Sequence, residues 1–438
     1  MCIPFRQCSF PHCNAFNVGV TGLMTSQEQK RASSRMTFAE LVAITAAVMA
    51  LNALAIDMML PALGQIGDEL GAARDNDRQL IIVVYVLGNG IAQLFFGPIV
   101  DRFGRKRVLM WSLGAYILGS ALSVFASSFS LLLAARAFQG VTTAATRVAA
   151  IAIVRDQCSG RRMAEVMSLA ITIFMAAPIL APGFGQLIMF AAPWRGIFIV
   201  LLLYGLVLAM WVGWRLTETM APEDRKPLRA GPIFESYATF VRNRTSIGYT
   251  MASALCFGAL FGYISTSEQV FLETFHIGNS FALAFALTAG AFGAATLINA
   301  RLVSRFGMRR LSHSALLVFI IANVLHLAIA ASTGETFVLF MLFMSLSFFA
   351  LGLIGPNATA MAMEPMGHNA GAAAAANGFA GTTIAGFLGG VIGRFYDGTT
   401  MPIIMGFTLL GIGAFAIVLW TEKGRLFHPN IPDPRDDE

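Results

Sequence analysis

The sequence predicts an all-α membrane protein of twelve transmembrane helices, arranged in two pseudo-symmetric six-helix halves with both termini in the cytoplasm. Three observations predict it. Apolar residues make up 56% of the 438 residues and charged residues only 12%, the apolar residues fall in runs long enough to cross a bilayer, and the second half repeats a motif of the first. A soluble domain carries about 25% charged residues. A soluble fold of this length needs more polar surface than this chain has, so we expect a bilayer as its solvent.

The apolar runs predict the number of spans. A membrane helix needs about 20 mostly apolar residues, because only a helix or a closed barrel satisfies backbone groups in hydrocarbon. The predicted spans are 38–62, 78–100, 108–127, 130–153, 163–191, 194–216, 246–273, 279–303, 312–331, 336–363, 369–393 and 401–420. The resulting segments are a disordered cytoplasmic tail (1–37), a six-helix half (38–216), a cytoplasmic central loop (217–245), a second half (246–420) and a cytoplasmic tail (421–438).

The basic residues predict the orientation. With the N-terminus inside, the cytoplasmic loops and tails hold 24 of the 30 Lys and Arg residues. The opposite side holds four, which are Arg74, Arg78, Arg195 and Arg394. Because basic short loops stay in the cytoplasm, both termini are predicted to be cytoplasmic. The same distribution accounts for the net charge of +6 without a nucleic-acid partner.

A segment after the second span recurs after the eighth. Gly97–Arg107 reads GPIVDRFGRKR, and Ala300–Arg310 reads ARLVSRFGMRR, 203 residues later. This shift is near half of the chain and indicates two parallel repeats, whose interface holds the substrate site in many transporters. Gly97–Arg107 resembles the signature loop of the major facilitator superfamily, G-x3-D-R-x-G-R-[RK]-x, and the resemblance covers the chain from about 38 to 420.

Four further stretches resemble the drug-exporting Bcr/CflA branch of that superfamily. They are AIDMMLPA (Ala55–Ala62), ARAFQG (Ala135–Gly140) with IVRD (Ile153–Asp156), APILAPGFG (Ala177–Gly185), and GPNATA (Gly355–Ala360) followed by Glu364. The resemblance implies the superfamily's fold and proton-driven export of drugs by alternating access, with the proton gradient as energy source in place of a cofactor.

Two charged residues lie inside predicted spans at matching depth. Asp57 lies in the outer part of the first span, and Arg136 in the outer part of the fourth, which runs the other way. A charge within a span costs roughly 2.5–3.5 kcal/mol, so it tends to face a cavity or a partner. Beside Arg136 the carboxyl of Asp57 stays ionised, and apart from it in a dry cavity it takes up a proton. We interpret them as a proton-coupling pair, as the resemblance also implies; a purely structural ion pair is the alternative.

Other polar side chains inside the spans are candidates for the same cavity. They are Arg147, Tyr85, Asn89, Gln93 and Glu268. Arg147 follows Arg136 by eleven residues, about 20° beyond three turns, so both share a helix face. Arg147 either lines the cytoplasmic end of the cavity or reaches the inner interface. The four-residue spacing from Tyr85 to Gln93 fits a cavity wall or ordinary packing, and Glu268 either contacts substrate or ends its helix.

The signature loop and the fifth span carry the remaining candidates. The gating-loop candidates are Gly97, Asp101, Arg102, Gly104 and Arg105, and those of the fifth span are Pro178, Pro182, Gly183 and Gly185. Asp101 can meet a helix N-terminus and nearby guanidiniums, and by resemblance these contacts latch the outward-facing state. Prolines bend a helix and glycines permit close contact, so the fifth span resembles an antiporter motif, with a packing kink as the alternative. Gln186 stands where many members have a second glycine.

Missing motifs narrow the function. No G-x4-G-K-[ST] loop points to ATP, and no H-E-x-x-H, serine-elbow or Cys-x-x-Cys motif points to an enzyme. The cysteines near His12 fit no zinc spacing, so no metal is expected. We predict a monomeric inner-membrane exporter of amphipathic small molecules, with substrate, protons and lipid as its partners. A proton-coupled uptake symporter and a non-transporting receptor or assembly factor remain the alternatives.

Overall fold

Twelve helices in the computed structural model, which describes residues 36–225 and 230–428, are long and apolar enough to cross a membrane. The crossing helices are α2 (Phe38–Asp57), which continues through the turn η1 (Leu60–Ala62) into α3 (Leu63–Leu70), α4 (Leu80–Phe103), α5 (Arg105–Val124), α6 (Phe129–Gln157), α7 (Gly160–Ala191), α8 (Arg195–Arg215), α10 (Arg244–Gln269), α11 (Phe281–Phe306), α12 (Met308–Thr333), α13 (Phe337–Met363), α14 (Ala370–Arg394) and α15 (Met401–Thr421). The predicted twelve spans are confirmed, and the tail 1–37 lies outside the described residues except for Met36 and Thr37.

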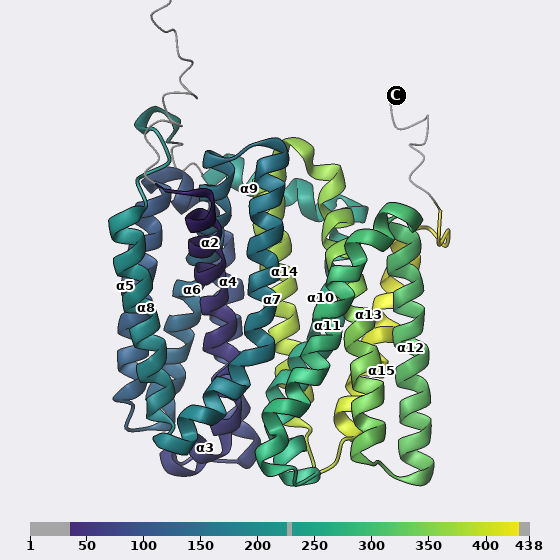
Figure 1. Ribbon diagram of the computed structural model, residues 1–438. Helices are drawn as coiled ribbons and strands as arrows, with labels where there is room; N and C mark the ends of the chain where they lie inside the picture. The colour runs from purple at the N-terminus through teal and green to yellow at the C-terminus, as the bar shows by residue number, and fades with distance from the viewer. Residues whose placement is uncertain (1–35, 226–229, 429–438) are drawn as a thin grey trace, which may run out of the picture. The chain divides into compact units, whose positions relative to one another are not determined.

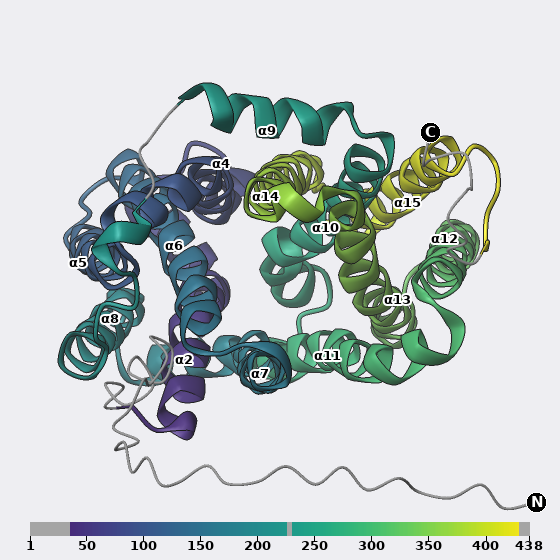
Figure 2. The same cartoon turned by 90° about the horizontal axis from the view of Figure 1, so that it is seen from above.

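The twelve crossing helices fall into two groups (Figure 1). In the first, α4 and α5 pack on α6, α5 also packs on α8, and α2 packs on α7. In the second, α10 packs on α13, α14 and α15, while α11 and α12 pack on α13. The two halves meet along two helix pairs, α4 with α14 and α7 with α11 (Figure 2). Any site between the halves is therefore bordered by these four helices.

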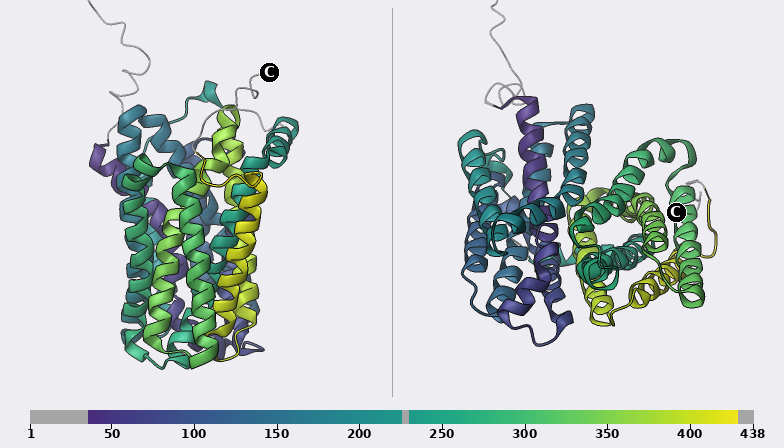
Figure 3. Two further views of the ribbon diagram at one scale, coloured as in Figure 1. Left: turned by 90° about the vertical axis from the view of Figure 1, so that its right-hand side faces the viewer. Right: turned by 60° about the horizontal axis from the view of Figure 1, so that its bottom comes forward.

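The two ends of the bundle differ in charge. The end that carries the start of α2, the turn from α4 to α5 and the turn from α11 to α12 holds the basic loops, and we call it the basic end (top in Figure 1). The opposite end carries α3, the short turn η2 (Asp75–Gln79) and the end of α10, and we call it the acidic end. The right-hand view of Figure 3 turns the acidic end toward the viewer.

The predicted repeat has the same backbone geometry in both halves. Gly104 ends α4 and directly precedes α5, and Gly307 ends α11 and directly precedes α12. Their φ angles are +99° and +79°. Only glycine adopts such values readily, so the glycine that recurs after 203 residues allows the same sharp reversal twice.

The central segment contains a helix where the sequence led us to expect only a loop. Helix α9 (Ala230–Arg242) runs along one side of the bundle near the basic end, outside α4 and α14 (Figure 2). The Tyr237 hydroxyl donates to the Leu94 carbonyl of α4 at 2.7 Å, and burial raises the pKa of this hydroxyl, so it remains a neutral donor. Phe240 packs with Ala373 of α14. This helix therefore contacts both halves, and the sequence interpretation missed it because the whole segment 217–245 was taken as a polar loop.

Candidate functional site

Each of the three guanidinium nitrogens of Arg136 makes a hydrogen bond inside the first half. Arg136 is 0% exposed. Its Nη2 donates to the Ala55 carbonyl at 2.9 Å, its Nη1 to Gln139 Oε1 at 2.5 Å, and its Nε to the Ile81 carbonyl at 3.4 Å. The Tyr85 ring centroid lies 4.3 Å from Cζ, which adds a cation–π contact. Arg136 therefore ties α6 to α2 and α4 through main-chain carbonyls.

Asp57 is buried at the end of α2 but is not paired with Arg136. It is 4% exposed, and its Oδ1 has no hydrogen-bond partner among the described residues. The ion pair expected from the sequence is absent from the described contacts in this conformation. Arg136 instead binds the carbonyl of Ala55, two residues earlier on the same helix. The physical reason is that this carbonyl and two further acceptors already bind the three guanidinium nitrogens.

The three candidates on α4 belong to a buried polar network. Its members are Asn52 of α2, Tyr85, Asn89 and Gln93 of α4, Thr143 of α6, and Thr382 of α14. The Tyr85 hydroxyl lies 2.9 Å from Asn52 Oδ1 and 3.0 Å from Thr143 Oγ1. The Asn89 amide donates to Thr143 at 3.1 Å. Gln93 Nε2 donates to Asn89 Oδ1 at 3.0 Å and to Thr382 Oγ1 at 3.2 Å.

This network connects Arg136 to the second half through the Tyr85 ring and Thr382. The sequence interpretation missed three of its members, which are Asn52, Thr143 and Thr382. Thr143 could have been found, because it follows Arg136 by seven residues and so shares its helix face. Thr382 carried no such signal, because its partner Gln93 is 289 residues away in the chain.

Arg147 lies on α6 with an exposed side chain. The exposed apolar face of this helix includes Phe138 and Val141. Arg147 follows Phe138 by nine residues, which places it half a turn away from that face. This position favours the inner side of the half over the lipid side for Arg147.

The described contacts of the signature loop are made within the first half and with Glu218 and Met220, which follow the last helix of that half. Arg105 Nη1 lies 2.9 Å from Asp101 Oδ1, and its Nε lies 3.1 Å from Asp156 Oδ2. Arg102 is exposed, and no atom lies within 4 Å of the position that a Cβ would take at Gly97. Latching of the outward-facing state by this loop therefore stays a prediction.

The carboxylate that meets the α5 N-terminus is Glu218, not Asp101 as the sequence suggested. Glu218 Oε1 accepts from the backbone N–H of Arg105 at 2.8 Å and of Lys106 at 3.4 Å. A Cβ at Gly104 would lie 2.6 Å from Glu218 Oε2, so the glycine leaves room for the carboxylate. Glu218 follows α8, so it holds the α5 start against the end of the sixth span.

Glu218→Gln is expected to lower the stability of the purified protein by about 0.3–1 kcal/mol, because a negative charge at a helix N-terminus is worth that much. The measurement is the apparent melting temperature in detergent at low and high salt, with a smaller difference at high salt. Glu223→Gln, at an exposed acid in the same segment, is the matched control and should not change it. Equal effects of the two substitutions would contradict the capping role.

Two glycines of α7 have different surroundings. A Cβ at Gly185 would overlap the Met58 carbonyl oxygen of the first span, whereas at Gly183 the nearest atom is Ala282 Cβ of α11 at 3.8 Å. Pro178 and Pro182 lie inside α7, which is continuous from Gly160 to Ala191. Gly185 therefore sets the approach of α7 to the residue after Asp57.

Side chains at the acidic end bind one half to the other. Gln79 donates to Gln269, and Asn76 Nδ2 donates to the Tyr396 carbonyl at 2.8 Å. Gln186 Nε2 donates to the Asn279 carbonyl at 3.1 Å, so the residue that departs from the antiporter motif makes an inter-half contact. The second-half ion-pair partners of Arg78 are Glu268 and Glu273. Glu268 thus contacts the first half rather than the polar network.

Comparisons with known proteins agree on one family. The model of the Major Facilitator Superfamily matches residues 45–390. An uncharacterized MFS-type transporter, YdgK, of Bacillus subtilis (strain 168) is 29% identical over 78% of this chain and 84% of the relative. A bicyclomycin resistance protein homolog of Haemophilus influenzae is 27% identical over 80% of this chain and 87% of its own length. The multidrug resistance protein MdtL of Klebsiella pneumoniae (strain 342) is 28% identical over 83% and 91%.

The fold is also similar to that of a solved transporter structure. The crystal structure of the human organic anion transporter MFSD10 (TETRAN) matches with a TM-score of 0.66 and 18% sequence identity. The match covers 88% of this chain and 100% of that chain.

Proposed function

Since the chain belongs to the major facilitator superfamily and is a multi-pass transporter of the inner membrane rather than an enzyme, we propose that it exports amphipathic small molecules in exchange for protons. Two relatives bear names that refer to resistance, one to bicyclomycin and one to multiple drugs. The prolines and glycines of α7 add the resemblance to an antiporter.

The observation that carries the proposal is the unpartnered carboxyl of Asp57. A buried ionised carboxylate without a partner costs several kcal/mol, so in this conformation the group holds a proton. Arg136 binds the Ala55 carbonyl, and two residues along a helix correspond to about 3 Å of rise. Ala55 and Asp57 also lie about 200° apart around the helix, so the step needs α2 to turn as well as to shift past α6; the guanidinium then meets Asp57, which releases its proton.

The contacts between the halves support a cytoplasm-facing conformation. Basic loops stay in the cytoplasm, so the acidic end faces outward. Inter-half hydrogen bonds and ion pairs hold the acidic end together, while the described contacts of the signature loop do not reach the second half. A proton on Asp57 in this conformation is the state that an antiporter reaches after taking the proton up outside. Substrate entering from the cytoplasm then exchanges for it.

The proton gradient is large enough for this task. One entering proton supplies about 2.3 kcal/mol at 100 mV and about 1.4 kcal/mol for one pH unit. Together they sustain roughly a several-hundred-fold gradient of a neutral compound.

The test is transport by purified protein in proteoliposomes with an imposed pH gradient. Bicyclomycin, chloramphenicol and ethidium serve as probes, and ethidium is permanently charged, so it is not trapped by pH alone. We expect at least one probe to accumulate in the acidic compartment, against the direction of proton flow, and a protonophore to stop it. Movement of a probe together with protons would establish symport instead, and no flux of any probe would favour the receptor.

A further inference from the structure

Arg78 of the first half lies between two carboxylates of the second half. Arg78 lies in the last turn of η2 and is 7% exposed. Its Nη2 binds Glu273, which lies in the π-helical turn η4 (Val270–Thr274) and whose side chain is 46% exposed. Glu268 of α10 is only 4% exposed, and its Oε2 lies 3.6 Å from Arg78 Nε without a hydrogen bond. The guanidinium is thus hydrogen-bonded to Glu273, and Glu268 is an additional buried acid.

Glu268 is enclosed by elements of both halves. A Cβ at Gly64 of α3 would lie 2.8 Å from Glu268 Oε1 and 2.9 Å from Arg78 Nη1, so this glycine leaves room for both groups. Neither Glu268 Oε2 nor Arg78 Nε has a hydrogen-bond partner among the described residues. A carboxylate in this position has lost its water and has not gained a full set of partners.

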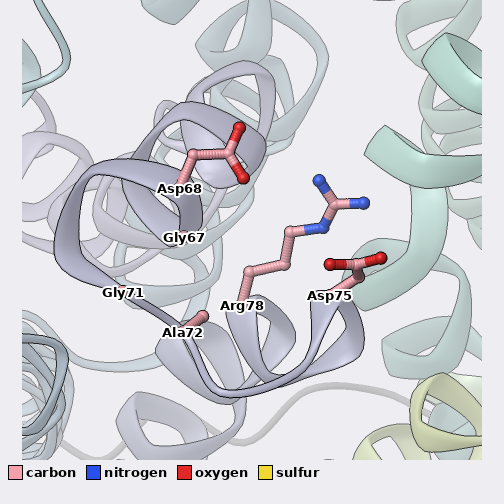
Figure 4. A pocket seen from close by; sticks show the side chains of 6 residues that line it. All are labelled: Gly67, Asp68, Gly71, Ala72, Asp75 and Arg78. Atoms are coloured by element: carbon pink, nitrogen blue, oxygen red, sulfur yellow. The ribbon is translucent and has the colours of Figure 1, made fainter.

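A polar cavity of about 290 Å³ reaches Arg78 at the acidic end. Its lining residues are Gly67, Asp68, Gly71, Ala72, Asp75 and Arg78. Figure 4 shows the Asp75 carboxylate beside the guanidinium and Asp68 across from it on α3. The cavity gives water, and with it protons, a place next to the guanidinium that Glu268 approaches.

The charges around Glu268 do not balance if it is ionised. The charged groups that face it are Arg78, Glu273 and Asp68, and Asp75 faces the same guanidinium. One cation among these described residues therefore meets four acids including Glu268. When the halves separate at this end, Glu268 returns to water and ionises. When they close, a buried carboxylate would join a guanidinium that Glu273 already occupies, which is unfavourable unless a proton comes with it.

We propose that Glu268 is a second proton-binding residue, which takes a proton from water at the acidic end as that end closes. The step transfers one proton to Oε2, so the acid enters the closed interface neutral, and it loses this proton when the end opens. The closed form binds the proton more tightly than the open form, so acid favours closure and alkali favours opening. This inference adds a site to the proposed antiport, but closure can be measured without any substrate.

The test is the distance across the acidic end as a function of pH. Spin labels are placed at Ala73 and Ser332, exposed positions in the two halves, in full-length protein whose native cysteines are replaced by alanine. The protein is studied in lipid nanodiscs by double electron–electron resonance from about pH 5 to about pH 8, which spans carboxyl titration in buried sites. We expect the ratio of long to short distances to rise with pH by up to about tenfold per unit.

Four variants locate the proton. Glu268→Gln should keep the short distance at every pH, because the amide is as neutral as the protonated acid. If the Glu268→Gln protein does not fold, Glu268→Met is used in its place. Glu273→Gln frees Arg78 to pair with ionised Glu268, so closure no longer needs the proton and the short distance should persist to higher pH. Asp77→Asn, which removes the other inter-half ion pair, Asp77 with Arg394 at 3.2 Å, should keep the wild-type response.

A wild-type pH response that survives in the Glu268 variant, or no response in the wild type, would overturn the proposal. Neither result tests the antiport proposal, which the flux assay in proteoliposomes tests separately. Conversely, a protein that moves no drug but closes in acid through Glu268 would refute the antiport and retain this site.

Discussion

Asp57→Asn is expected to abolish export while the protein remains folded and in the membrane. The asparagine has the shape of the neutral acid, so the packing seen at the end of α2 is retained, but it can neither ionise beside Arg136 nor release a proton. The concentration gradient should fall from roughly several hundred-fold to the passive level, since no proton energy remains coupled. The measurements are growth in bicyclomycin, flux into proteoliposomes and protein level in the membrane.

Asp397→Asn is the matched control, because it makes the same change at an exposed acid in the loop before α15, and it should export normally. Export by Asp57→Asn at the wild-type rate would show that the acid has only a structural role. Arg136→Ala should also abolish export but gives a less specific result. It leaves two main-chain carbonyls and Gln139 without their donor, and each such buried group costs about 1–3 kcal/mol.

Gly185→Ala should destabilise the protein far more than Gly183→Ala. The added methyl at position 185 overlaps the Met58 carbonyl, so α7 must move away from the first span. Overpacking of this kind costs typically 1–3 kcal/mol, and we expect about the upper value because the obstacle is backbone. The measurements are the yield of monodisperse protein and its apparent melting temperature in detergent.

Gly183→Ala is a control on the same helix, two residues away. Its methyl meets only Ala282 Cβ at 3.8 Å, and alanine is the better helix former by about 1 kcal/mol. This variant should be as stable as the wild type or slightly more stable. Similar losses in both variants would mean that α7 needs glycine for its own flexibility and not for its contact with Met58.

Much of the candidate site could be anticipated from single helices. Burial of Asp57 and Arg136 followed from the high cost of charge in a span, and Tyr85, Asn89 and Gln93 share a polar face because they are four residues apart. The hydrogen-bond partners of these side chains could not be predicted from single helices. Gln93 reaches Thr382, and Arg136 binds main-chain carbonyls of α2 and α4, which carry no side-chain signal.

The contacts at the acidic end show most clearly what could not be predicted from the sequence. The sequence presents Arg78 as one of four basic residues in the external loops, a charge that counts only for orientation. In the structure it is buried beside Glu268, 190 residues away, and the two lie in different halves. Nothing in the local sequence around either residue indicates that it contacts the other half.

The sequence by itself determined the solvent, the number of spans and the duplication of this protein. Hydrocarbon leaves the backbone no partner except its own helix, so length and hydropathy are enough to locate each span. Which side chains meet between the halves was decided only by tertiary structure. In the membrane, helices associate through local packing and hydrogen bonds rather than through a general hydrophobic force, and those contacts depend on how the two halves are placed.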